Sequence, residues 1–247
     1  MISSSLRNLV FKLRYGFKGV PLTIADQTIR LDESLRRWNL ETEWAAYQIL
    51  RESLNPGDVF IDIGANFGLH TLYAAQLVNH QGHVFAFEPV PSNLTLLQKN
   101  VALNGVQHQV KIVPQSLSNS SESFLTFYLP SEKVAVTASL RPNSDNRKTI
   151  QVANSRLDDY WSNINLPVQL IKIDVEGAEV EVLRGAENVL KQWHPKLLIE
   201  VHGFALPNFG TSVNELRDFL KHLGYQERLL EGEQFHTEHY FQALYSS

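Results

Sequence analysis

The stretch Asp62-Ile63-Gly64-Ala65-Asn66-Phe67-Gly68 decides the fold class of this 247-residue chain. It follows the apolar run Val59–Ile61 and precedes a helical pattern, so it predicts a strand, a tight loop and a helix. Gly64 and Gly68 let the backbone turn sharply and lie against a ligand, and Asp62 at the strand end can accept hydrogen bonds from that ligand. This arrangement favours a nucleotide-like cofactor.

A carboxylate at the end of the next predicted strand supports this interpretation. The β-rich run His83–Phe87 ends in Glu88, about 20 residues beyond the loop, where mononucleotide-binding units place the carboxylate that binds the ribose hydroxyls. The glycine spacing then narrows the choice of cofactor. Dinucleotide folds carry G-x-G-x-x-G against a pyrophosphate, whereas this chain has G-x-x-x-G and no G-x-x-x-x-G-K-[ST] phosphate loop.

Length and composition bound the class of protein. With 43% hydrophobic residues the chain can bury one large core, and we expect one domain at residues 55–247 behind an N-terminal extension and helix at residues 1–54. A formal net charge of -4, without basic runs that interleave aromatics, argues against a nucleic-acid partner. The lack of cysteine excludes disulfides, zinc-thiolate sites and a thiol nucleophile.

The sequence also predicts how the protein relates to membranes. It has no run of about 18 apolar residues and no signal-type segment, so we expect a cytoplasmic protein without stable membrane insertion. Residues 6–20 mix apolar and basic residues in an amphipathic pattern. This segment could lie on a membrane or a partner, or pack as a helix on the catalytic domain or across a homodimer.

The order of the other segments predicts an α/β fold. Helices are expected at 41–54, 69–78, 91–104, 177–191 and 212–223, and strands at 59–63, 83–88, 109–113, 168–175, 196–201, 225–230 and 239–245. Successive strand–helix units imply a doubly wound, mostly parallel sheet between two helical layers, closed by a terminal antiparallel pair. Residues 114–167 break this rhythm and are expected to form an inserted hairpin or lid, with arms at 124–129 and 134–140 and a short strand at 149–153.

Polar side chains lie near the ends of two later strands. Lys172 and Asp174 share one face of their strand, and Glu200 and His202 share one face of the next, because side chains alternate with a period of two. Strands buried on both faces normally read as continuous apolar runs, so polar groups there are costly unless they serve a site. The structural alternatives are a Lys–carboxylate pair that satisfies itself and a Glu176 that only caps the helix that follows.

Four motifs, in order, resemble the FkbM family of methyltransferases. They are Asp-Ile-Gly-Ala-Asn-x-Gly at 62–68, Phe-Glu-Pro at 87–89, Ile-Lys-Ile-Asp-Val-Glu-Gly-Ala-Glu at 171–179 and Ile-Glu-Val-His at 199–202. The resemblance covers about Pro56 to His202. It implies a class I Rossmann-like fold with strand order 3-2-1-4-5-7-6 and S-adenosylmethionine as cofactor.

The resemblance also implies residue roles. Asp62, Gly64, Ala65, Asn66 and Gly68 would wrap the methionine and ribose portion of the cofactor, Glu88 with Pro89 would bind the ribose, Ser116 and Leu117 would flank the adenine, and Asp174 would serve both cofactor and reaction. Family members act on sugar hydroxyls, polyketide hydroxyls and peptide termini. We therefore expect methylation, most simply O-methylation of a hydroxyl or carboxyl, on a small-molecule, glycan or peptide natural-product acceptor.

The expected chemistry needs a proton acceptor. His202, with an ordinary pKa near 6.5, is predicted to be the general base, while Asp174 orients it, takes the proton or holds the substrate, and Lys172 restrains Asp174. Asp174, Glu200 and His202 could instead bind a divalent ion. We favour a metal-free site, because the Lys172 ammonium would neutralise Asp174 and repel a cation.

Other functions stay open at this point. A nicotinamide-dependent oxidoreductase would share the strand, loop and acidic strand end, but its glycine spacing differs. A non-catalytic S-adenosylmethionine-binding module would share all the cofactor motifs. A nucleic-acid methyltransferase acting on exocyclic amines would need an Asn/Asp-Pro-Pro-aromatic motif where this chain has Asp174-Val175-Glu176-Gly177.

Overall fold

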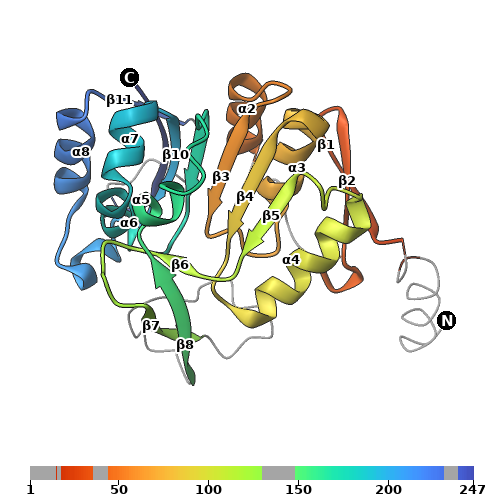
Figure 1. Ribbon diagram of the computed structural model, residues 1–247, viewed down its shortest axis with the longest axis horizontal. Coiled ribbons are helices and arrows are strands. Elements are labelled where there is room, and N and C mark those ends of the chain that lie inside the picture. Colours follow the sequence, from red (N-terminus) through yellow and green to blue (C-terminus); the bar gives the residue numbers. More distant parts are fainter. Residues whose placement is uncertain (1–14, 16–17, 36–43, 130–147, 231–238) are drawn as a thin grey trace.

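A seven-stranded sheet forms the centre of the protein (Figure 1). The structure, a computed structural model, describes residue 15 and residues 18–35, 44–129, 148–230 and 239–247. In spatial order the strands are β11 (Gln226–Leu229), β12 (Phe241–Ser246), β10 (Lys196–Val201), β9 (Leu170–Ile173), β3 (Val59–Ile63), β4 (His83–Phe87) and β5 (Val110–Val113). The neighbours from β10 to β5 pair in parallel, and β12 is antiparallel to both β10 and β11. This confirms the predicted strand order and the terminal antiparallel strand.

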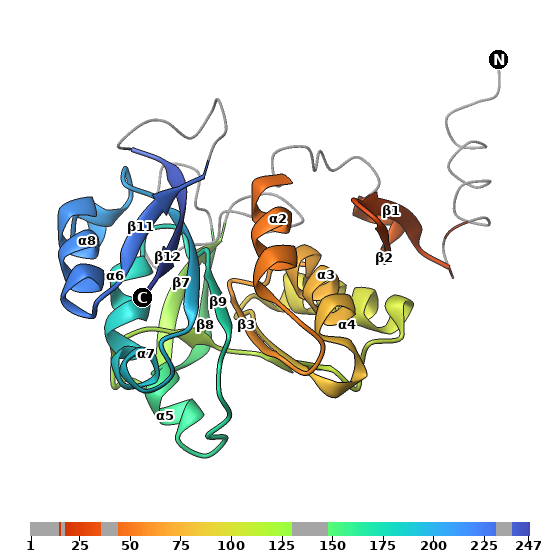
Figure 2. The same cartoon turned by 90° about the horizontal axis from the view of Figure 1, so that it is seen from above.

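Helices cover both faces of the sheet (Figure 2). One face carries α2 (Trp44–Ser53), α3 (Leu69–Val78) and α4 (Pro91–Asn104), and the other carries α5 (Leu157–Trp161), α6 (Glu179–Gly185), α7 (Glu187–Trp193) and α8 (Val213–His222). Alternate residues of one strand serve the two layers, since Phe60 packs into one apolar cluster and Ile61 into the other. The three-layer αβα architecture is therefore confirmed.

The expected insertion contains a second, small sheet. Its strands are β6 (Ser116–Leu117), β8 (Lys148–Ser155) and β7 (Phe124–Leu129), with β8 in the middle. β7 pairs antiparallel with β8, from Phe124 opposite Ala153 to Leu129 opposite Lys148. The predicted arm at 134–140 lies outside the described residues. Among the described residues, the strand that pairs with 124–129 is β8, which includes the segment 149–153 that was expected to be a separate short strand.

The single helix predicted at 177–191 is wrong, because the structure has two helices there. α6 ends at Gly185, and α7 begins at Glu187. Gly185 lies against the backbone of the insertion, where an added Cβ would come within 2.3 Å of the Ser118 carbonyl oxygen. A close approach of this kind favours glycine and coincides with the break between the helices.

The N-terminal extension contains a hairpin that the sequence did not predict. β1 (Val20–Ile24) pairs antiparallel with β2 (Gln27–Leu31), and Asn104 of α4 holds it by hydrogen bonds to the backbone N–H (2.8 Å) and carbonyl (2.7 Å) of Arg30. Most of the amphipathic segment 6–20, and the first residues of the helix expected at 41–54, lie outside the described residues. Within the described part of the chain, no helix has the length and apolar character needed to cross a bilayer.

Candidate active site

The glycine loop after β3 meets the segment after β9. Gly64 has φ +80°, and a Cβ there would lie 1.9 Å from the Asp174 carbonyl oxygen. Gly68 has φ +94°, and its Cβ would lie 2.5 Å from a Leu97 methyl group. Both glycines therefore allow close packing in a left-handed backbone conformation, in addition to the predicted approach of a ligand.

Glu88 lies where the sequence placed it, at the carboxyl end of β4. Its oxygens accept hydrogen bonds from the Asn66 N–H (2.8 Å), the Val90 N–H (2.9 Å) and the Asn93 amide (3.3 Å). The residue is 4% exposed, and burial raises its pKa to about 7 despite these donors. Asn93 was not identified from the sequence.

A cavity with about 640 Å³ of empty space opens at these strand ends. It brings together seven of the predicted cofactor residues, namely Gly64, Asn66, Glu88, Pro89, Ser116, Leu117 and Asp174. Phe127 of β7 and Gln115 also line it, so the inserted sheet contributes to its wall. Backbone, carboxylate, hydroxyl and apolar groups thus face one space.

A second cavity, with about 570 Å³ of empty space, adjoins the first. Gly64, Asn66, Asp174 and Glu176 line both, so the two spaces meet at these residues. Ala65, Gly68, His70, Lys172 and Glu200 line only the second one. The predicted loop residues Ala65 and Gly68 therefore face the second cavity.

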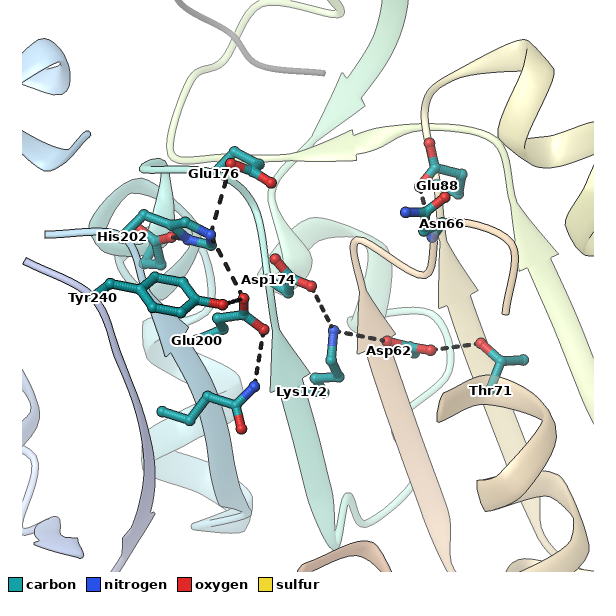
Figure 3. Close-up of polar contacts among 12 residues, drawn as sticks. Asp62, Asn66, Thr71, Glu88, Lys172, Asp174, Glu176, Glu200, His202 and Tyr240 are labelled. Atoms are coloured by element: carbon teal, nitrogen blue, oxygen red, sulfur yellow. Dashed lines mark hydrogen bonds and ion pairs between the residues drawn. The ribbon is translucent and has the colours of Figure 1, made fainter. Parts of the chain in front are cut away.

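Asp62 lies behind both cavities in an ionic chain (Figure 3). It is 1% exposed, it accepts a hydrogen bond from the Thr71 hydroxyl (2.6 Å), and its other oxygen is 4.0 Å from Lys172 Nζ. Lys172 donates to Asp174 at 3.1 Å. Burial would raise the pKa of Asp174, but the charges of Lys172 and His202 outweigh it and leave that pKa lowered.

His202 lies among carboxylates beside the second cavity (Figure 3). Its Nδ1 is 2.8 Å from Glu179 Oε1, and its Nε2 is 3.7 Å from Glu176 Oε2 and 3.8 Å from Glu200 Oε1. Burial lowers the pKa of His202, but the hydrogen bond to Glu179 and the charges of Asp174, Glu179 and Glu176 together raise it to about 10. These carboxylates favour the protonated form of the imidazole, in contrast to the base titrating near pH 6.5 that the sequence predicts, and the role of His202 as general base stays a prediction.

The sequence analysis missed three residues of this cluster. Glu179 is 0% exposed and also accepts from the Gly177 N–H (3.0 Å). Glu176, read as a helix cap, instead faces the cavities from a left-handed backbone conformation (φ +54°), and burial raises its pKa to about 7. Tyr240 donates to Glu200. Glu176 and Glu179 belong to the quoted 171–179 motif, so their carboxylates were the available signal.

The site could also hold a metal ion. Asp174, Glu200 and His202 each offer one ligand atom, and these atoms lie within 4.8 Å of one another. The preference for a metal-free site rested on Lys172 beside Asp174, a contact that the structure contains. Glu176 and Glu179 add two further carboxylates beside His202.

The sheet order, the glycine loop after β3 and the acidic end of β4 define a class I methyltransferase fold. The chain belongs to the methyltransferase FkbM family, whose domain model matches residues 62–227. S-adenosylmethionine is the methyl donor of this family, which confirms the predicted family and cofactor and removes the nicotinamide alternative.

This chain is similar to several methyltransferases over part of their lengths. The chain is 36% identical over 155 residues to Methyltransferase 1 of Beauveria bassiana, which is 54% of this chain and 60% of that protein. It is 28% identical to the hexuronic acid methyltransferase AglP of Haloferax volcanii, over 74% of this chain and 72% of AglP. It is also 28% identical to the 31-O-demethyl-FK506 methyltransferase FkbM of Streptomyces tacrolimicus, over 60% of this chain and 67% of that protein.

Solved structures support the fold. Methyltransferase FkbM from Methylobacillus flagellatus superposes with a TM-score of 0.51 at 16% identity, covering 98% of this chain and 59% of that one. At this identity the likeness shows a shared fold.

Proposed function

We propose that this protein transfers the methyl group of S-adenosylmethionine to an oxygen atom of a sugar or natural-product acceptor. The observation that supports this most directly is the pair of cavities that meet at Gly64, Asn66, Asp174 and Glu176. One cavity has the lining expected for a nucleoside, and the other is rich in carboxylates. The names of two relatives, a hexuronic acid methyltransferase and a 31-O-demethyl-FK506 methyltransferase, agree with an oxygen acceptor.

The first cavity receives the cofactor in this proposal. Glu88 accepts both ribose hydroxyls, Ser116 and Leu117 flank the adenine, and Gly64 and Asn66 of the loop lie beside the methionine portion, where the two cavities meet. Asp62 contributes indirectly, since Lys172 lies between it and Asp174. Its buried position suits it to orienting Lys172 better than to contacting the ligand.

The second cavity receives the acceptor. The acceptor oxygen attacks the methyl carbon in line with the carbon–sulfur bond, that bond breaks, and the sulfonium becomes a neutral thioether. The acceptor's proton goes to a carboxylate, for which Glu176 and Glu200 both face the cavity. His202 lies beside both carboxylates and positions them.

An exposed aromatic ring contacts His202 of this cluster. Phe204 follows β10 and is 60% exposed, and its ring centroid lies 5.8 Å from that of His202. A single exposed apolar ring needs no explanation in general, but beside an acceptor cavity it offers a flat surface for a sugar or polyketide.

Methyl transfer is tested with methyl-labelled S-adenosylmethionine. The protein is incubated with uronic-acid oligosaccharides, hydroxylated macrolides and fractionated extract of the source cells, and products are identified by mass spectrometry. A methyl ether survives mild alkali, whereas a methyl ester is hydrolysed, so this treatment separates hydroxyl from carboxyl acceptors. Cofactor binding with no labelled product in any fraction would support a non-catalytic binding module instead.

A further inference from the structure

Two neighbouring strands bring three metal-type ligands together at the acceptor cavity. Asp174 follows β9, and Glu200 and His202 lie at the end of β10. We propose that Asp174, Glu200 and His202 bind one divalent cation, which holds the acceptor oxygen beside the methyl donor. The cation's role in catalysis rests on the proposed function, whereas the binding site itself stands on the geometry below.

The first support is the position of His202 Nε2. His202 is 4% exposed, and among the described residues Nε2 has no partner at hydrogen-bond distance, since Glu176 Oε2 is at 3.7 Å and Glu200 Oε1 at 3.8 Å. Two ligands that each lie about 2.1 Å from one cation are about 3.0 Å apart at a right angle and at most about 4.2 Å apart. The 3.8 Å between His202 Nε2 and Glu200 Oε1 is thus too long for a hydrogen bond and suitable for two ligands of a common ion, and Asp174 completes a set whose ligand atoms lie within 4.8 Å of one another.

Buried partners orient two of the three ligands. Glu179, which is 0% exposed, accepts the Nδ1 proton of His202 at 2.8 Å and leaves Nε2 facing the space between the carboxylates. Glu200 is held at both oxygens, by the Tyr240 hydroxyl and by the Gln242 amide at 3.1 Å (Figure 3). A carboxylate behind a ligating histidine is the usual second layer of a metal site.

The local charge balance is the second support. Four carboxylates, those of Asp174, Glu176, Glu179 and Glu200, surround one imidazole. Among the described residues, Lys172 supplies an ammonium group to this cluster, and its Nζ lies 3.1 Å from Asp174 Oδ2. A divalent cation among these side chains would supply positive charge that favours the ionised form of neighbouring carboxylates.

The donor set selects the kind of ion. Carboxylates with one imidazole suit ions that accept both oxygen and nitrogen, such as Mn²⁺, better than Mg²⁺, which prefers oxygen and water. Mn²⁺ is therefore the probe for the site, and Mg²⁺ the comparison.

The test is calorimetric titration of the full chain with MnCl₂ after EDTA treatment and dialysis, without cofactor or acceptor. We expect one Mn²⁺ per chain and a melting temperature that rises with Mn²⁺ concentration. Glu200→Gln and His202→Asn should each weaken binding at least tenfold. Glu187→Gln, which changes a carboxylate of α7 paired with Lys191, should leave it unchanged.

Folding of each variant is checked by its binding of S-adenosylmethionine and by its urea transition. If His202→Asn does not fold, Glu200→Gln decides, because an amide keeps the shape of Glu200 and can still accept from Tyr240. A wild type that binds S-adenosylmethionine but not Mn²⁺, or Mn²⁺ binding that both variants retain, overturns the proposed site. Labelled product without Mn²⁺ binding rejects the cation and keeps the methyltransferase, whereas Mn²⁺ binding without product supports the cation site alone.

Discussion

The affinity for S-adenosylmethionine should depend on the ionisation of Glu88. Burial raises the pKa of this carboxyl to about 7 in the empty protein, whereas two ribose hydroxyls are bound best by the ionised form. Below pH 7 most of the free protein carries a protonated Glu88, so binding of the cofactor requires the removal of this proton. The apparent Kd equals the Kd of the ionised form multiplied by one plus the ratio of protonated to ionised Glu88. This factor is about 1.1 at pH 8 and about 11 at pH 6. We therefore expect about tenfold weaker binding at pH 6 than at pH 8.

The assay is calorimetric titration of S-adenosylmethionine between pH 6 and 8.5, in buffers with different ionisation enthalpies. At pH 7 binding should release about half a proton. Glu88→Gln should bind about 30-fold more weakly at pH 8, as expected for the loss of roughly 2 kcal/mol in charge-assisted hydrogen bonds, and should lose most of the pH dependence. A Glu88→Gln variant with the affinity and pH profile of the wild type would refute the placement of the ribose at Glu88.

Four further outcomes follow from the described contacts. The free wild-type protein should lose up to about 3 kcal/mol between pH 5 and pH 8 in urea titrations, because a carboxyl whose folded pKa is raised to about 7 loses stability as pH rises from its unfolded value through that pKa, and Glu88→Gln should lose this part of the pH dependence. Gly64→Ala should cost more than about 3 kcal/mol by the same measurement, since its Cβ would meet the Asp174 carbonyl; a stable variant would refute this packing. Asn104→Ala should cost about 1–3 kcal/mol by removing both bonds to Arg30, and an unchanged urea midpoint would show that the hairpin needs no such anchor. Phe204→Ala should raise the KM for the acceptor several-fold while the melting temperature and cofactor affinity stay unchanged; an unaltered KM would exclude the ring from the acceptor site.

The sequence predicted the strands of the central sheet and the residues that line the first cavity because those signals are local, whereas the strand order came from the resemblance to the FkbM family. A buried parallel strand reads as an apolar run, its glycine-rich turn follows at once, and Glu88 terminates the next strand. The hairpin at 20–31 gave a weaker signal, since its turn at Ala25-Asp26 lacks the usual glycine even though Ala25 takes φ +52°. The break between α6 and α7 depends on the distant Ser118 backbone, which no local pattern reveals.

The ionisation of His202 could not be predicted, because it depends on residues that only the fold brings together. The sequence placed Glu200 beside His202, but Glu179 and Glu176 approach from the segment after β9. An ordinary pKa was the only available assumption for the isolated residue. The same folding also places Tyr240, some forty residues away in sequence, on Glu200.

The charge of the acceptor cavity has a consequence for the reaction. Methyl transfer converts a positive sulfonium into a neutral thioether, so carboxylates left without countercharge near the sulfur would stabilise the reactant more than the transition state and slow the reaction. Lys172, which donates to Asp174, limits this effect in the part of the cluster next to Gly64 of the glycine loop. A cation between Glu200 and His202 would neutralise the rest and lower the pKa of the bound acceptor hydroxyl. Glu176, which lines both cavities, would then remain as the carboxylate free to take the proton released by the acceptor.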